Sequence, residues 1–236
     1  MKKLLLASAA IALTSGMASA EDVKIGILYG FTGPIESLTG HMANASEAAM
    51  KEVNDSGKSA YTFSSVRGDS TCVDAAAAQT AAEKMVTSDG VKGILGGDCS
   101  GVTGAVLQNV ARPNGIVMIS PSATSPALST AEDDGLFFRT APSDAREGEI
   151  AAEILQEHGV KSIALTYSNS DYGKGLAEAI ATSFEKLGGK ININIPHEDG
   201  KSDYSADLPS SWGMLILTLP PSFSKEPAMA SARPLP

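Results

Sequence analysis

The sequence predicts an α/β protein of two lobes, each a parallel sheet with helices on both faces. Apolar strands alternate with helical segments along most of the chain, an order typical of parallel sheets. A second strand–helix series begins near Asp144, after a short strand at 136–140. Alanine and glycine are plentiful and only 5% of the residues are aromatic, which favours thin helices packed on a sheet.

The first twenty residues have the pattern of a secretory signal peptide. Lys2 and Lys3 precede an apolar stretch at 4–14, and Ala18-Ser19-Ala20 matches a cleavage site. The apolar stretch is short for a bilayer span, so we favour cleavage over a membrane anchor. We therefore expect an exported protein, cleaved after Ala20, that begins at Glu21.

The first lobe is expected to span residues 21–140, and its elements follow from hydrophobic patterning and turn residues. Expected strands lie at 23–28, 60–67, 91–95, 115–120 and 136–140. Expected helices lie at 41–54, 74–86 and 101–111, the first of them after a loop at 30–40 rich in Gly, Thr, Ser and Pro.

The second lobe is expected to be partial and to span residues 141–208. Asp144 is a candidate N-cap of a helix that reaches His158, and Gly159 is a candidate C-cap. The elements expected after it are a strand at 161–167, a loop at 168–171, a helix at 173–187 and a strand at 190–195.

Residues 209–236 form an atypical, proline-rich tail. They hold six of the twelve prolines, and no helix is predicted there. A disordered tail would explain this change of composition, and so would a frameshift or premature end near Leu208.

Charge and composition exclude several classes of function. Removing Lys2 and Lys3 changes the net charge from −9 to −11, which disfavours nucleic acid and anionic membranes. No later segment approaches eighteen unbroken apolar residues, so we expect a soluble protein. Two distant cysteines and three scattered histidines are too few for a metal site, and no cofactor is indicated.

Enzyme motifs are absent from the sequence. It holds no phosphate-binding P-loop, no H-E-x-x-H and no G-x-S-x-G nucleophile elbow. An exported hydrolase would need a Ser–His pair, and no histidine lies near Ser100 in the sequence. We therefore expect a protein that is not an enzyme.

Three loops after expected strands consist of small hydroxyl residues and glycine, at 97–101, 120–124 and 168–173. In open α/β sheets, ligands sit beyond the carboxyl ends of the strands. Main-chain N–H groups and the hydroxyls of Ser100 and Thr124 would suit a small zwitterion such as an amino acid. Ordinary turn chemistry accounts for the same composition equally well.

Cys72 and Cys99 are the two cysteines of the chain. Export places them in an oxidising compartment, where an even count suggests a disulfide. Two buried free thiols are the alternative.

The chain resembles the branched-chain amino-acid binding proteins of ABC transporters, of the leucine/isoleucine/valine type. Six segments, found in the family's order within residues 21–208, carry the resemblance: VKIGILYGFTGP (23–34), DSTCVDAAAAQTAAEKMV (69–86), GILGGDCSGVTGAV (93–106), GIVMISPSATSPAL (115–128), LFFRTAPSD (136–144) and YSNSDYGKGLA (167–177). The resemblance implies a type I periplasmic-binding-protein fold that closes on its ligand, with 136–144 as the first crossover between lobes. It also implies a Cys72–Cys99 disulfide.

The resemblance assigns ligand-binding roles to five residues. Ser100 and Thr124 match residues that hold the carboxylate and ammonium of an amino acid, beside the main chain of Ser122 and Ala123. Tyr172 matches the residue of the second lobe that covers the ligand.

The function implied is a periplasmic receptor that delivers a branched-chain-type amino acid or related amide to ABC transporter permease subunits. We expect a monomer without a cofactor. A ligand-sensing domain of a signalling system with the same fold is the alternative. Chains of the family continue well beyond this length. A further alternative is therefore that this shortened chain binds its solute weakly or not at all.

Overall fold

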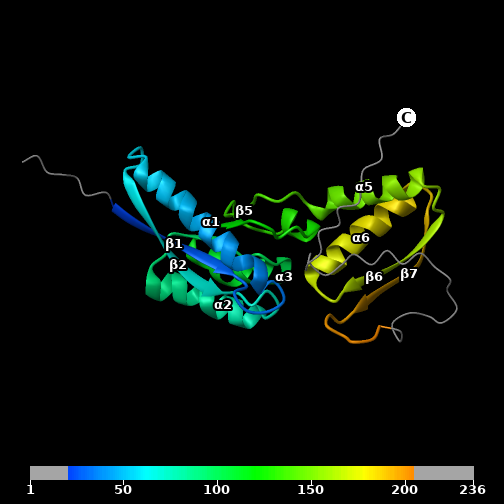
Figure 1. Cartoon of the computed structure of the whole chain (residues 1–236), viewed down its shortest axis with the longest axis horizontal. Coiled ribbons are helices and arrows are strands. Elements are labelled where there is room, and N and C mark those ends of the chain that lie inside the picture. The colour runs from blue at the N-terminus through cyan, green and yellow to red at the C-terminus, as the bar shows by residue number, and fades with distance from the viewer. Residues whose placement is uncertain (1–20, 205–236) are drawn as a thin grey trace, which may run out of the picture.

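The computed structural model describes residues 21–204 and places them in two lobes, each built on a parallel sheet (Figure 1). This confirms the predicted α/β class. The predicted signal peptide at 1–20 and the predicted tail at 209–236 lie outside the described residues.

The first sheet has five parallel strands in the order β2-β1-β3-β4-β5. They are β1 (Glu21–Tyr29), β2 (Tyr61–Asp69), β3 (Gly93–Gly96), β4 (Val117–Ser120) and β5 (Phe137–Arg139). Strand β1 pairs on both edges, with β2 and β3. Successive side chains of a strand point to opposite faces, and Ile27 and Leu28 are both fully buried. The apolar run at the start of the chain is therefore a strand covered on both faces.

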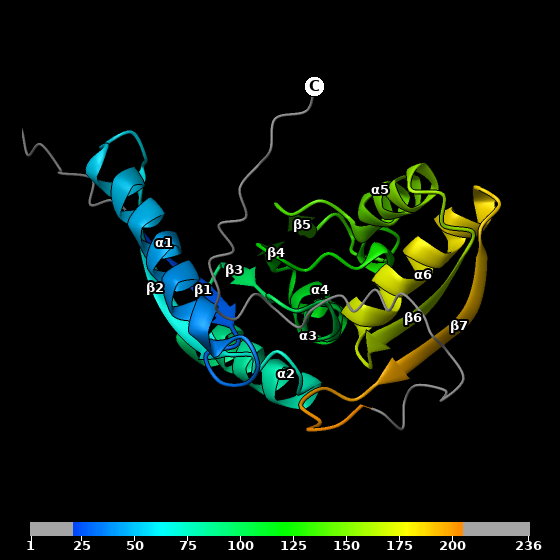
Figure 2. The same cartoon turned by 45° about the vertical axis from the view of Figure 1, so that its right-hand side comes forward.

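Helices lie on both faces of this sheet (Figure 2). They are α1 (Glu36–Asp55), α2 (Ala75–Lys84) with the π-helical turn η1 (Met85–Asp89), and α3 (Ser100–Val106) with η2 (Leu107–Ala111) and the short α4 (Arg112–Asn114). Helix α1 packs Ala43 against Ile27, whereas Ala78 of α2 belongs to the buried cluster around Leu28. The two sides of β1 therefore face two different helical layers.

Helix α1 begins at Glu36, so the predicted start at His41 is wrong. Thr39 has no exposed surface, and its hydroxyl donates a hydrogen bond to the carbonyl of Gly30 at 3.0 Å. This contact ties the first helical turn to the end of β1. Small polar residues that favour a loop are therefore helical here.

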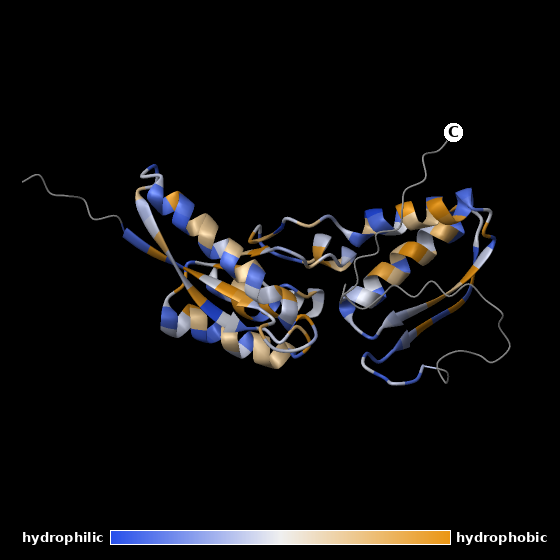
Figure 3. Ribbon diagram, in the orientation of Figure 1, coloured by the Kyte–Doolittle hydropathy of each residue, from blue (hydrophilic) through white to orange (hydrophobic). Residues whose placement is uncertain are grey.

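The second lobe is small within the described residues. It consists of α5 (Asp144–Glu157), β6 (Ser162–Ser168), α6 (Asp171–Lys186) and β7 (Lys190–His197). Apolar residues recur along α5 and α6 (Figure 3). Phe184 and Ile180 of α6 share one buried cluster with Ile163 and Leu165 of β6. The core of this lobe is separate from that of the first lobe.

Helices α5 and α6 approach so closely at Gly148 that there is no room for a side chain. A Cβ atom at Gly148 would lie 2.5 Å from the carbonyl carbon of Ala179. We expect Gly148→Ala to force the helices apart and to lower the free energy of unfolding by about 1–3 kcal/mol, as overpacking does.

Gly40→Ala is the matched control for this prediction. Gly40 also lies inside a helix, but a Cβ atom there would meet nothing within 4 Å. Because alanine favours helix over glycine, Gly40→Ala should be stabilising by about 0.5–1 kcal/mol. Urea denaturation should therefore move the two variants in opposite directions, and equal shifts would contradict the close packing at Gly148.

Part of the first sheet remains uncovered by the described residues. Val117, Ile119 and Phe138 share one face of β4 and β5 and are 38%, 37% and 54% exposed. The pairing Ile27–Leu95–Ile119 shows that this is the face on which α1 packs. Parallel sheets are normally covered by helices on both faces. On this face of the sheet, helix α1 covers β1 and β2 (Figure 1).

Candidate functional site

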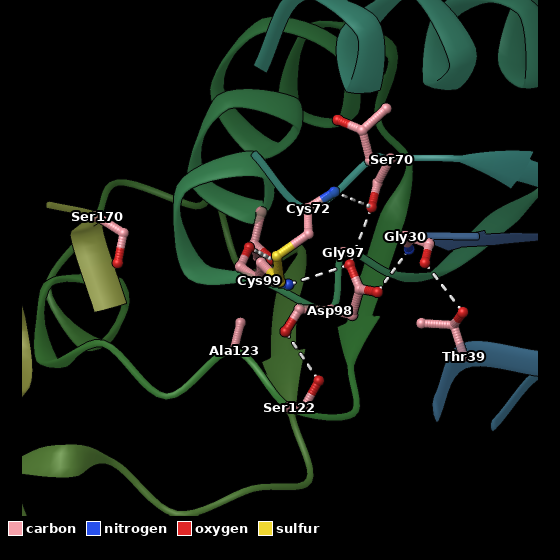
Figure 4. Close-up of a disulfide and its surroundings, with 12 residues drawn as sticks. Gly30, Thr39, Ser70, Cys72, Gly97, Asp98, Cys99, Ser122, Ala123 and Ser170 are labelled. Atoms are coloured by element: carbon pink, nitrogen blue, oxygen red, sulfur yellow. Dashed lines mark hydrogen bonds between the residues drawn. A yellow bond between two sulfur atoms is a disulfide. The ribbon is translucent and has the colours of Figure 1, made fainter. Parts of the chain in front are cut away.

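The loops after β1, β2, β3 and β4 meet around buried Asp98 at the carboxyl edge of the first sheet (Figure 4). The Asp98 carboxylate accepts hydrogen bonds from the N–H of Gly30 at 2.6 Å and the hydroxyl of Ser70 at 2.9 Å. Its main-chain carbonyl accepts the Ser122 hydroxyl at 2.8 Å. Burial raises the pKa of Asp98, and the bonds from Gly30 and Ser70 oppose that rise. One acid therefore ties four loop ends together.

This role of Asp98 differs from the prediction, which assigned Asp98 no function. The available signal is an acid placed between glycine and cysteine directly after an apolar strand. That signal is weak because most aspartates in loops are exposed, and burial depends on strands distant in the sequence.

The structure confirms the predicted disulfide between Cys72 and Cys99. Their Cα atoms are 5.2 Å apart, and the bond joins the loop after β2 to the residue before α3. The Ser70 hydroxyl accepts the N–H of Cys72 at 3.3 Å, so the disulfide and Asp98 share a partner (Figure 4). The loop that presents Ser100 is therefore held both covalently and by hydrogen bonds.

Ser100 is the first residue of α3, and only 4% of it is exposed. Its hydroxyl oxygen accepts the N–H of Ser125 at 3.1 Å. This bond uses a lone pair and leaves the hydroxyl proton available for an acceptor. Toward a ligand, Ser100 can therefore act as a donor, which suits a carboxylate.

Ser122 and Ala123 lie in the turn after β4. Ser122 is exposed, whereas Ala123 is fully buried. The N–H of Ala123 donates to the Ser120 hydroxyl at 2.9 Å, and its carbonyl accepts Arg139 at 3.3 Å. The turn is therefore held in one conformation by groups on both sides of it.

Thr124 contacts Asp144 twice. The Thr124 hydroxyl donates to the Asp144 carboxylate at 2.9 Å, and the Asp144 N–H donates to the Thr124 carbonyl at 3.0 Å. Asp144 was predicted to cap α5, which is wrong: the cap is Ser143, whose hydroxyl accepts the N–H of Ala145. The side chain of Asp144 instead connects the start of α5 to the loop of the first lobe.

The two predicted hydroxyls consequently have opposite hydrogen-bonding character. Thr124 gives its proton to Asp144 and presents lone pairs, whereas Ser100 accepts from Ser125 and keeps its proton. A group that accepts next to one that donates matches the ammonium and carboxylate of an amino acid.

Tyr172 lies in the first turn of α6, which begins at Asp171, so the predicted loop placement is wrong. The ring is 46% exposed. Burial raises the pKa of Tyr172, and the charges of Asp144 and Glu147 raise it further. Tyr172 therefore stands near the acid that binds Thr124.

The two lobes approach each other at the start of α6. A Cβ atom at Gly101 would lie 3.4 Å from the Asp171 carboxylate, and one at Gly175 would lie 2.9 Å from the Ser125 hydroxyl. Glycine at these positions lets the second lobe come close to the loops that carry Ser100 and Thr124.

Other features of residues 21–204 are weaker candidates for a functional site. An open hollow of about 180 Å³ beside α1 is lined by residues such as Glu47, Lys51 and Phe63, none of them predicted site residues. Among the described residues, no group of three or more His, Cys, Asp or Glu is arranged to hold a metal ion. Within residues 21–204, none of the helices combines the length and the apolar character that a membrane span requires.

Comparison with known proteins places these observations in a family. A family model described as periplasmic binding protein matches residues 22–208. The chain is 32% identical over 218 residues to the Leu/Ile/Val-binding protein homolog 3 of Brucella melitensis, covering 87% of this chain and 56% of that protein. It is 32% identical over 200 residues to the Leu/Ile/Val-binding protein of Escherichia coli K12, covering 84% and 52%.

Solved structures show the same fold. The branched-chain amino acid transporter substrate-binding protein LivJ of Streptococcus pneumoniae, in complex with isoleucine, matches with a TM-score of 0.68 and 26% identity. That match covers 79% of this chain and 53% of LivJ. A solute-binding protein of R. palustris in complex with 4-hydroxybenzoate matches with a TM-score of 0.69 at 19% identity, covering 78% and 49%, and shows the fold alone. The chain spans about half the length of the relatives it matches.

Proposed function

Because the chain belongs to the periplasmic binding protein family, we propose that it binds a small amino acid and delivers it to an ABC transporter. The observation that carries the proposal is the opposite hydrogen-bonding character of Ser100 and Thr124 at one edge of the sheet. The names of the relatives, Leu/Ile/Val-binding proteins, support a branched-chain side chain.

In this proposal the first lobe supplies the polar half of the site. Ser100 donates to the ligand carboxylate, Thr124 accepts from the ammonium, and the turn at Ser122 and Ala123 shapes the floor. Tyr172 covers the ligand from the second lobe. The proposed partners are the permease subunits of the transporter, and the proposed location is the periplasm after cleavage following Ala20.

We expect Ser100→Ala and Thr124→Val each to weaken leucine binding by about tenfold or more. Each change leaves a charged ligand group short of a hydrogen bond, which costs about 1–3 kcal/mol. The described second lobe has only two strands and two helices to cover the ligand, so we expect weak binding. Ligand-observed NMR is the suitable measurement because it detects weak binding.

Thr130→Val is the matched control, because Thr130 is exposed and its hydroxyl bonds to Ala127 of its own turn. It should leave the affinity unchanged. Equal affinity for leucine in the wild type, Ser100→Ala and Thr124→Val would remove both residues from the site.

A further inference from the structure

Asp144 is a buried acid with a specific partner in the other lobe. It is 2% exposed, stands at the start of α5, and joins Thr124 through one side-chain and one main-chain hydrogen bond. These two bonds close a ring between the loop after β4 and the start of the second lobe. The ring fixes both the main chain and the hydroxyl direction of Thr124.

The direction of the side-chain bond decides what Thr124 can recognise. A hydroxyl has one proton, and an ionised carboxylate can only accept, so Thr124 must donate to Asp144. The oxygen then offers lone pairs alone to anything bound beside it. A protonated amine satisfies them with a charge-assisted hydrogen bond, and a hydroxyl satisfies them with a weaker neutral one. A carbonyl oxygen or a carboxylate would face acceptor against acceptor.

Arg139 supports the same loop from the other side. Its guanidinium donates to the carbonyls of Ala123 at 3.3 Å and Ser125 at 2.9 Å. The segment that leaves the first sheet therefore holds this loop in two ways. Arg139 binds the main-chain carbonyls of the loop, and Asp144 binds the side chain of Thr124. Burial raises the pKa of Asp144, the hydrogen bond from Thr124 opposes that rise, and the charges of Glu147 and Arg139 act in opposite directions on it.

We propose that Asp144 is a positioning residue that fixes the Thr124 hydroxyl as an acceptor and thereby makes the site select ligands with a protonated amine. This inference rests on the proposed function. It extends it by naming a residue, not expected to touch the ligand, that sets the preference for amine over hydroxyl.

The test compares leucine with 2-hydroxy-4-methylpentanoate, which has the same skeleton with a hydroxyl in place of the ammonium. In Asp144→Asn the NH2 group of residue 144 can donate to Thr124, which releases the Thr124 proton toward the ligand, and in Asp144→Ala the acceptor of that proton is gone. Measured by ligand-observed NMR on the full chain, the ratio of the two affinities should fall by about tenfold, the effect of one charge-assisted hydrogen bond.

Glu147→Gln is the matched control. Glu147 lies in the same first turn of α5, carries the same charge and is exposed, so it tests the effect of charge without the hydrogen bond. The ratio should stay as in the wild type. An unchanged ratio in both Asp144→Asn and Asp144→Ala, or an equal loss for both ligands, overturns the proposal, because a merely structural role would weaken both alike.

A second measurement decides the proposal independently of binding. Three-bond couplings to the Thr124 methyl carbon report its rotamer, which should be single in the wild type and averaged in Asp144→Ala. A single unchanged rotamer in Asp144→Ala overturns the proposal even if leucine binds. Absence of leucine binding to the wild type, with the rotamer change present, overturns the proposed function and leaves the positioning contact supported.

Discussion

Phe184→Ala is expected to unfold the second lobe while the first lobe stays folded. Phe184 is fully buried and is the largest side chain in the cluster that joins α6 to β6. Truncating a buried phenylalanine costs about 3–5 kcal/mol. A whole domain is stable by only about 5–15 kcal/mol, and a small lobe lies at the low end of that range. The loss is therefore comparable to the stability of the lobe.

Hydrogen exchange resolved by peptide distinguishes the two lobes. Peptides from α5 to β7 should lose protection in Phe184→Ala, whereas those from β1 to β4 should keep it. Phe138→Ala is the matched control, because the same ring at that position is 54% exposed and should cost little. Equal loss of protection in both lobes would contradict two separate cores.

Removal of the disulfide is expected to destabilise the first lobe by about 3.5 kcal/mol in the chain-entropy model. The bond closes a loop with a sequence separation of 27, and its loss frees that loop in the unfolded state. Cys72→Ser/Cys99→Ser should therefore unfold at markedly lower urea concentration than the oxidised wild type.

Reducing agent provides the control for this prediction. It should lower the midpoint of the wild type toward that of the double variant and leave the double variant unchanged. The effect should appear in peptides of the first lobe, because both cysteines lie there. Coincident midpoints for oxidised wild type and double variant would show that the hydrogen bonds around Asp98 hold the loops without the covalent bond.

The strands could be predicted from the sequence because burial on both faces leaves a direct trace in composition. The apolar run around Ile27 and Leu28 is such a trace, and β1 contains it. The start of α1 could not be predicted, because it depends on the bond from Thr39 to Gly30, a contact across the loop between two elements. Local composition alone favours a loop there.

The site shows the same division. Small hydroxyl residues after strands pointed to the Ser100 and Thr124 loops, because parallel strands bring their carboxyl ends to one edge. The role of Asp144 was missed because Ser143 and Asp144 are both good caps, and the choice between them depends on Thr124 in a distant loop. Buried polar partners of this kind are fixed by tertiary structure.

Mapping leucine binding by amide chemical shifts tests most directly whether the loops of both lobes form one amino-acid site. On adding leucine, we expect the largest shifts at Ser100, Thr124 and Tyr172 together, with smaller shifts for 4-methylpentanoate, which lacks the ammonium. Shifts confined to the hollow near Glu47 and Phe63, or no shifts at millimolar leucine, would contradict a single amino-acid site formed by the loops of both lobes.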